Sequence, residues 1–155
     1  MGQLIRDEGA QSILIEYILI ASITLLFTGG VYMAVGDMIV DASTQSMIEQ
    51  YTDIGNEISG TMSSMYLSGI SNGTASKRIK IPVYIADDGY RIDCNVTDEY
   101  GRQAIKISAM YNMGAVTYIP LNNLTEQVNV SGTIYSGSGE VIISYNTIQG
   151  KIELN

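Results

Sequence analysis

The chain opens with a long apolar stretch that no charged side chain interrupts. Residues 17–36 include no Asp, Glu, Lys or Arg, and a charged tip at residues 6–8 precedes them. An α-helix rises about 1.5 Å per residue, so twenty residues span roughly 30 Å, which is the thickness of the hydrocarbon core of a bilayer. The pattern therefore predicts a transmembrane helix, or an equally buried one, over residues 17–36.

Beyond this run, apolar residues keep recurring three or four positions apart, as on one face of a helix. They are Met47, Ile48, Tyr51, Ile54, Ile58, Met62 and Met65. The sequence predicts one helix over residues 10–67, with its later stripe packed on a C-terminal domain. Glycines at 29, 30 and 36 indicate either a local bend or close packing of helices, because Gly costs nearly 1 kcal/mol relative to Ala in a helix.

The period then changes from that of a helix to that of a strand. Residues 68–76 are turn formers and predict a linker. Apolar residues alternate from residue 77, first with Ile79, Ile81, Val83 and Ile85 on one face, and again over 90–96, 105–109, 116–120, 128–135, 141–146 and 148–154. Residues 136–139, Ser-Gly-Ser-Gly, favour a hairpin tip. The predicted fold class is α+β, a long hydrophobic helix followed by a small antiparallel β-sheet or β-sandwich over residues 77–155.

Composition narrows the function. The net charge is −8, with 8 Lys and Arg against 16 Asp and Glu, which argues against nucleic-acid binding. The chain has one cysteine, Cys94, so an intrachain disulfide and a cysteine-based metal site are excluded. Its place in the alternation with Tyr90 and Ile92 predicts simple packing in the core.

Nothing in the sequence favours catalysis. The chain has no His, and its acidic clusters, at residues 87–88 and 93–99, lie where turns are expected. A calcium site there stays a minor alternative, because the acids lack the spacing of a known calcium loop. We expect a protein that is not an enzyme and needs no cofactor or metal.

The charges near the apolar run give its orientation. Arg6 and the amino terminus are the positive charges next to it, so we expect a cytoplasmic start and an external C-terminal domain. The run exceeds the 7–15 residues of a secretory signal and lacks a small-residue cleavage site at its end, so we expect it to be retained. Glu16 either lies in headgroup water or needs a partner, since an unpaired acid in a bilayer is costly.

Residues 8–17, Glu-Gly-Ala-Gln-Ser-Ile-Leu-Ile-Glu-Tyr, with the apolar run after them, resemble the class III signal peptide of archaeal type IV pilin-like and archaellin-like proteins. The resemblance implies that a prepilin-type peptidase removes residues 1–9 on the cytoplasmic side. The retained helix would first anchor the precursor in the cell membrane. It would later pack with its neighbours as a homo-oligomeric helical filament outside the cell.

The resemblance extends to single residues. Glu8 matches the charged position before the cut, and Gly9 matches the small residue at the cut, with Ala10 and Gln11 as the other candidates. Family members usually carry an acid at the fifth mature position. Glu16 would be seventh, sixth or fifth after a cut behind Gly9, Ala10 or Gln11, respectively. The resemblance implies that Glu16 pairs with the amino terminus of a neighbouring subunit.

Four Asn-x-Ser/Thr sequons, at Asn72, Asn95, Asn123 and Asn129, lie in the part expected outside the cell. We expect glycosylation first at Asn72 and Asn123, which lie in predicted turns. The favoured function is a structural subunit of a type IV pilus-like filament that serves adhesion or motility. The alternatives are an anchored accessory or stator-like protein, whose β domain binds an envelope or filament-base partner, and a plain anchored ectodomain.

Overall fold

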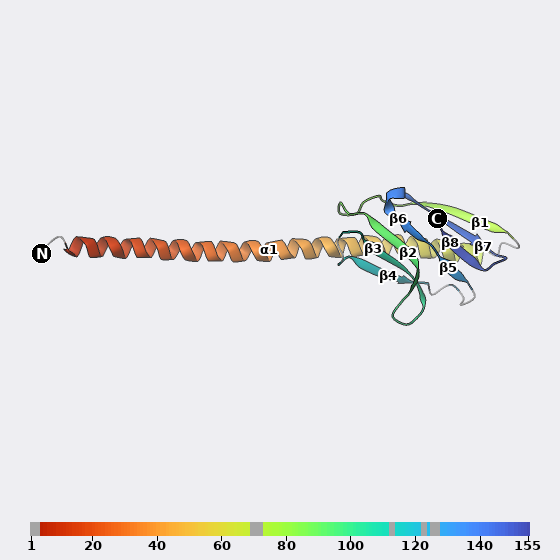
Figure 1. Ribbon diagram of the computed structural model, residues 1–155, viewed down its shortest axis with the longest axis horizontal. Helices are drawn as coiled ribbons and strands as arrows, with labels where there is room; N and C mark the ends of the chain where they lie inside the picture. The colour runs from red at the N-terminus through yellow and green to blue at the C-terminus, as the bar shows by residue number, and fades with distance from the viewer. Residues whose placement is uncertain (1–3, 69–72, 112–113, 122–123, 125–127) are drawn as a thin grey trace. The chain divides into compact units, whose positions relative to one another are not determined.

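The computed structural model describes residues 4–68, 73–111, 114–121, 124 and 128–155, with side chains from residue 11 onward. The chain forms two compact units, Met1–Ala42 and Ser43–Asn155. One helix, α1 (Leu4–Leu67), makes up the described part of the first unit and begins the second (Figure 1). We call the second unit the head.

In the first unit, the described side chains of α1 are not covered by any other part of the chain that the structure describes. Every described side chain from residue 11 to residue 42 is exposed in the single chain. The helix runs through Gly29, Gly30 and Gly36 without a break, and a Cβ atom added at any of them would meet nothing within 4 Å. Contacts within one chain therefore do not require glycine at these positions.

The described part of the head contains eight strands in two four-stranded sheets. The strands are β1 (Thr74–Lys80), β2 (Tyr90–Thr97), β3 (Gln103–Ala109), β4 (Val116–Pro120), β5 (Asn129–Ser131), β6 (Thr133–Tyr135), β7 (Glu140–Asn146) and β8 (Lys151–Leu154). The sheet orders are β1-β7-β8-β5 and β4-β3-β2-β6. Strand pairs are antiparallel except β5 and β8, which run parallel.

The chain passes directly from one sheet to the other between β5 and β6. The prediction of one strand over residues 128–135 was wrong, because β5 ends at Ser131 in one sheet and β6 begins at Thr133 in the other. Gly132 lies between them with a φ of 125°. Its carbonyl accepts a hydrogen bond from the N–H of Cys94 at 2.9 Å, which holds the corner against β2.

Further predictions differ from the structure, and one is the last strand, which begins at Lys151 rather than at residue 148. The first strand begins at Thr74 rather than at residue 77 and ends at Lys80, where the chain turns away from β7. Ile85 and Asp88 then exchange backbone hydrogen bonds across a tight turn. Residues 136–139 do not form a hairpin tip: the 3-10 turn η1 (Ser136–Ser138) carries the chain from β6 to β7, which belong to different sheets.

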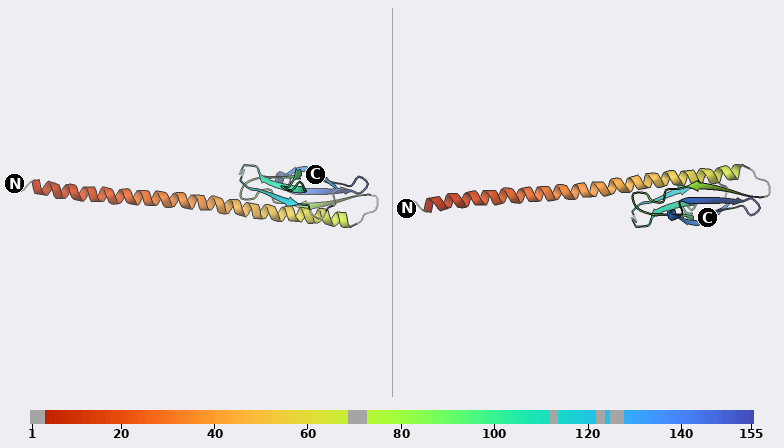
Figure 2. Two further views of the ribbon diagram at one scale, coloured as in Figure 1. Left: turned by 90° about the horizontal axis from the view of Figure 1, so that it is seen from below. Right: turned by 90° about the horizontal axis from the view of Figure 1, so that it is seen from above.

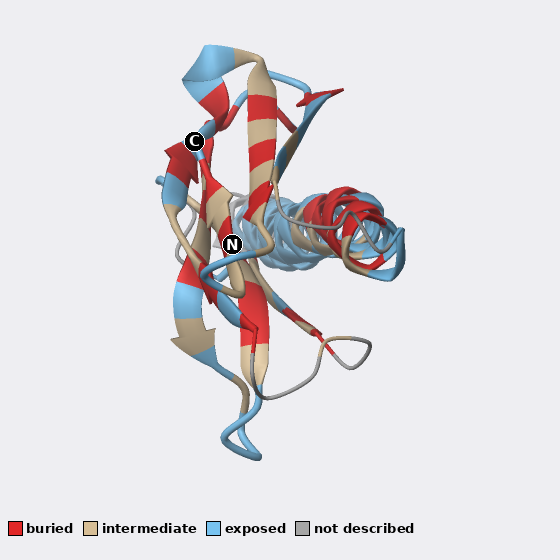
Figure 3. Ribbon diagram, turned by 90° about the vertical axis from the view of Figure 1, so that its right-hand side faces the viewer, coloured by how far each residue is buried: buried red, intermediate tan, exposed pale blue. Residues whose placement is uncertain are grey.

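Both sheets and the head part of α1 share one hydrophobic core. The predicted helical stripe is buried from Met47 to Met65, with Ile48 partly buried. Buried and less buried residues alternate along the strands, visible as bands of colour in Figure 3. Cys94 is 1% exposed, as its place in the alternation predicted. The α+β fold class is confirmed, with two four-stranded sheets packed against one long helix.

The head part of α1 lies close along the strands, as both views in Figure 2 show. Tyr51 contacts Tyr90 of β2, with ring centroids 5.3 Å apart. One helical turn further toward its C-terminus, α1 lies next to β4. A Cβ atom on Gly55 would clash with the side chain of Ile119, coming within 2.7 Å of its Cγ1. Tyr66 meets Tyr145 of β7 at 6.2 Å, so α1 contacts both sheets.

Candidate assembly surface

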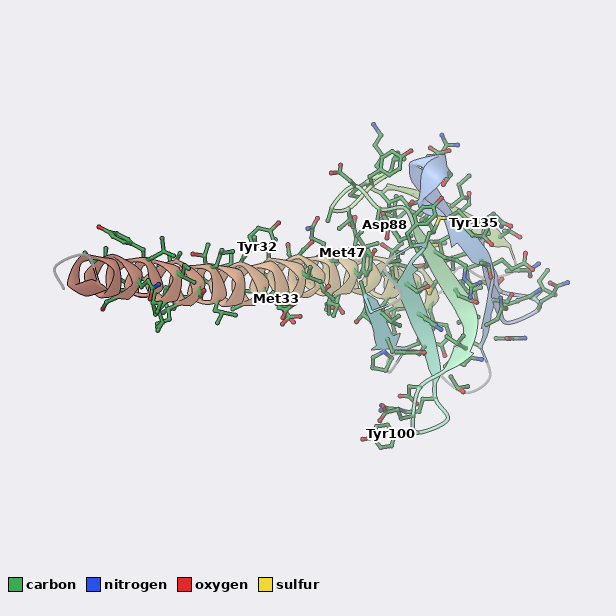
Figure 4. All side chains as sticks on the ribbon, turned by 60° about the vertical axis from the view of Figure 1, so that its left-hand side comes forward. Tyr32, Met33, Met47, Asp88, Tyr100 and Tyr135 are labelled. Atoms are coloured by element: carbon green, nitrogen blue, oxygen red, sulfur yellow. The ribbon has the colours of Figure 1, made fainter. Side chains whose placement is uncertain are left out.

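Most of the exposed large hydrophobic side chains that the structure describes lie in the first unit of α1. Leu26 and Phe27 expose 78% and 72% of their area, and every described side chain from residue 11 to residue 42 is exposed. Figure 4 shows Tyr32 and Met33 standing out from the helix. By length and composition, α1 can cross a membrane. Burying one such side chain gains about 1.5–3 kcal/mol, so this surface favours lipid or other apolar helices over water.

The polar groups within this surface are compatible with such surroundings. The hydroxyl of Ser22 donates to the carbonyl of Ile18 at 2.7 Å, and that of Thr24 donates to the carbonyl of Ile20 at 2.8 Å. A hydroxyl bonded to its own helix leaves no unsatisfied donor in an apolar medium.

The predicted processing residues lie at the start of α1. Gly9 and Ala10 belong to the helix by their backbone, and Gln11 is exposed. The side chain of Glu16 is also exposed, and it takes part in none of the ion pairs between side chains that the structure describes. Cleavage at residues 9–11 and pairing of Glu16 with a neighbour stay predictions.

Two of the four sequons fall on described residues. Asn129 is exposed in β5, whereas Asn72 and Asn123 lie outside the described residues. Asn95 lies at a bulge of β2, where its side-chain N–H donates to Asp93 at 3.2 Å and to Thr133 at 3.3 Å. Its amide nitrogen is thus engaged in the folded head. Glycosylation stays a prediction at all four.

The acidic clusters of the head stabilise its turns. The Asp98 carboxylate accepts backbone N–H groups of Tyr100 and Arg102 at 2.9 and 2.8 Å and pairs with the Arg102 guanidinium at 2.6 Å. Asp88 accepts the N–H of Tyr111 at 3.2 Å. Among the described residues, no group of three or more His, Cys, Asp or Glu side chains is placed to hold a metal ion.

Cys94 is packed rather than available for chemistry. Burial, with a smaller contribution from the charge of Asp93, raises the pKa of its thiol to about 12. A thiol with so high a pKa is a poor nucleophile at neutral pH, because the thiolate is the reactive form.

The head also has a shallow polar depression over β1, β7 and β8. It encloses about 100 Å³ and is lined by Thr74, Ser144, Asn146, Gln149, Lys151 and Glu153. This is well below the roughly 300–1,000 Å³ of a typical small-molecule pocket. The apolar surface of α1 is therefore the stronger candidate.

The sequence patterns did not single out the exposed lysines of β1. Their significance depends on β1 being an edge strand, which the structure shows. The sequence feature that could have pointed to these lysines is the distribution of charge, because the chain has no Lys or Arg between Arg6 and Lys77.

A model described as "Family of unknown function (DUF7266)" matches residues 6–155, which include the described helix and all the strands. No curated protein and no solved structure matches the chain.

Proposed function

This chain belongs to the DUF7266 family, a family of unknown function, and we propose that it is a structural subunit of an extracellular filament of the type IV pilus kind. The observation that carries the proposal is the double use of α1 (Leu4–Leu67). Its first part offers an apolar surface on every side, and its last part supplies the central stripe of the core of the head. A pilin-like subunit needs both in one helix.

A plain membrane anchor does not require one helix that is shared between the membrane span and the folded domain. An anchored ectodomain can carry a separate linker between its span and its folded domain, whereas α1 passes from the exposed apolar part into the core of the head without interruption. The class III signal-like residues 8–17 favour the same conclusion, because they place the predicted cut before the apolar stretch and leave α1 intact.

Assembly then proceeds by exchanging one apolar environment for another. The precursor is held in the membrane by residues 17–36, and a prepilin-type peptidase removes residues 1–9. Lipid and packed helices are similarly apolar, so moving the helix from one to the other has little hydrophobic cost, and close packing and polar contacts decide the outcome. Glu16 would be such a contact, paired with the new amino terminus of a neighbour.

Amino-terminal sequencing and intact mass of the protein, recovered from membranes and from shed filaments, test this proposal. We expect a start at Ala10, Gln11 or Ser12 with the helix retained, and the mature chain in filaments. Gly9→Val should abolish a cut after residue 9, whereas Gly2→Val, a matched change within the leader, should not.

The other functions predict different results. A start at Met1 or Gly2 in the membrane fraction would indicate a plain anchored ectodomain. A mature start found in membranes, with no chain in any filament, would favour the accessory or stator-like protein whose head binds an envelope partner.

A further inference from the structure

Charge is divided unevenly along this chain. Residues 7–76 include eight acidic residues and no Lys or Arg, whereas residues 77–155 include seven of the eight basic residues and eight acidic ones. All four ion pairs between described side chains join residues of the second group. Within the described part of the chain, the acids of α1 and part of the basic charge therefore have no ion-pair partner.

On the head part of α1, three acids form what we call the acidic stripe: Glu49, Asp53 and Glu57. They are spaced four residues apart, which places them one above another on a helix, and all are exposed. Like charges at this spacing repel by a few tenths of a kcal/mol per pair. Glu49 accepts a hydrogen bond from the side chain of Gln45 at 3.2 Å, and none of the three acids forms an ion pair in the described part of the chain.

Strand β1 carries three exposed basic residues, Lys77, Arg78 and Lys80. We call them the basic edge. Arg78 pairs loosely with Glu140 at 3.5 Å. Lys77 and Lys80 are the basic side chains without an ion pair or aromatic contact among those the structure describes. The others are engaged as Arg91–Asp93, Arg102–Asp98, Lys151–Glu153 and Lys106 over the ring of Tyr118.

The position of β1 in its sheet makes the basic edge accessible. In the described sheet, β1 is the first strand and pairs with β7 on one side. Lysines on an edge strand commonly prevent aggregation by edge-to-edge pairing. That role accounts for Lys77 and Lys80 but leaves the acidic stripe unexplained.

The two surfaces carry charges of opposite sign and extend over similar lengths. Glu49 and Glu57 are eight residues apart, or about 12 Å along a helix. Lys77 and Lys80 are three residues apart, or about 10 Å along a strand, and extend from opposite faces of the sheet at its edge. Complementary surfaces on one chain that do not meet within it can meet between copies. Such a contact joins two different surfaces, so it does not close on itself in a dimer and can extend into a helical array.

We propose that copies of this chain dock side by side, with the acidic stripe of one copy against the basic edge of the next. This inference rests on the proposed function in taking the copies to be neighbours, in the membrane or in the filament. Its partner is a second copy of the same chain, and the contact is made by the heads rather than by the apolar part of α1.

A carbodiimide, which joins an amine directly to a carboxylate in contact with it, tests the pairing on the full-length chain in membranes and in any filaments. Mixing unlabelled and ¹⁵N-labelled copies distinguishes links between chains from links within one chain. We expect interchain links from Lys77 or Lys80 to the acidic stripe. Their absence while other interchain links form, or their presence only within one chain, would overturn the inference.

Charge reversal gives an independent test by fluorescence energy transfer between labelled copies in one vesicle. Asp53→Lys with Glu57→Lys, or Lys77→Glu with Lys80→Glu, should each weaken association by on the order of tenfold or more, because like charges then face each other. Lys106→Glu with Lys151→Glu makes the same change in net charge as Lys77→Glu with Lys80→Glu, but elsewhere on the head, and should leave association unchanged.

Mixing the two reversed variants is the decisive step. The positive stripe of one variant then faces the negative edge of the other, so association should return, which also shows that both variants are folded. If the mixture associates no better than either variant alone, the pairing is wrong.

These results separate the inference from the proposed function. Filaments of processed chains that form equally well with either reversed variant would refute the charge pairing and leave the filament role intact. Chains that keep residues 1–9 and form no filament, yet give the predicted interchain links in membranes, would refute the filament role and support the pairing.

Discussion

Replacing Gly132 by Ala should destabilise the head more than any exposed glycine substitution. The φ of 125° at Gly132 lies in a region that residues with a Cβ rarely adopt, which costs about 1–3 kcal/mol. The added Cβ would also lie 2.9 Å from the Cβ and the N of Leu154 in β8 and would contact its carbonyl oxygen. Overpacking the added Cβ against these atoms of Leu154 costs about a further 1–3 kcal/mol.

The sum is about 4 kcal/mol, near the middle of these ranges. For a domain of this size, 1 kcal/mol shifts the melting temperature by about 4 °C, so we expect Gly132→Ala to lower Tm by about 15 °C. Near-ultraviolet circular dichroism of the tyrosines follows packing of the head in the full-length chain in detergent, because 9 of the 11 tyrosines lie in the head.

Gly101→Ala is the matched control. Gly101 also has a positive φ, of 75°, but a Cβ there would meet nothing within 4 Å. It should therefore show the backbone cost alone, about 1 kcal/mol or roughly 4 °C. If the two variants melt within a few degrees of each other, the close approach of β8 to Gly132 is not what requires glycine.

Two further predictions concern buried polar groups. The hydroxyl of Tyr51 is buried without a hydrogen-bond partner among the described residues. In a thermal melt, Tyr51→Phe should therefore leave the free energy of unfolding unchanged or raise it by up to about 1 kcal/mol. A clear fall in the free energy of unfolding would show that the hydroxyl has a partner. Burial raises the pKa of Cys94 from 9.0 to about 12, and burial followed by the charge of Asp88 raises that of Tyr51 from 10.0 to about 12. The unfolded chain therefore loses these protons first, so the stability that they contribute is complete below pH 9 and is lost as the pH rises from about 9 to 12. Cys94→Ala should flatten the fall in Tm between these pH values. An unchanged dependence of Tm on pH would contradict the contribution of the Cys94 thiol.

The helix was predictable because its signal is local. An apolar period of three or four residues describes one face of a helix whatever lies opposite it, and α1 ends at Leu67, just after the last member of the predicted stripe. The alternation at Tyr90, Ile92 and Cys94 likewise needs only one buried face, and all three are buried in β2.

The strand partners were not predictable in the same way, because they depend on residues far away in the sequence. Val128 to Tyr135 alternates like a single strand, and the break at Gly132 is explained by Leu154 in β8 and Cys94 in β2. The Ser-Gly-Ser-Gly stretch suits any tight turn, so its composition does not distinguish a hairpin from a passage between sheets. Ile119 in β4 similarly explains why Gly55 is the residue that allows α1 to approach.

The two candidate surfaces likewise differ in how far the sequence alone predicts them. The apolar surface of α1 follows from the sequence alone, because it needs no tertiary contact to exist. The basic edge does not, because Lys77 and Lys80 gain their meaning from the place of β1 at the margin of a sheet whose neighbouring strand, β7, lies some sixty residues later.

The packing of α1 in the head bears directly on what a repeated contact could build. Tyr51 and Gly55 lie close to β2 and β4, and Tyr66 lies against β7, so the helix is fixed to both sheets. The acidic stripe and the basic edge therefore hold a constant geometry within each head. A contact between surfaces held in this way repeats with the same rotation and rise at every step, which yields an ordered helix of subunits, whereas a loosely tethered head would give only irregular association. Loosening the helix at Gly55 should thus disorder an assembly even where every charged residue is unchanged.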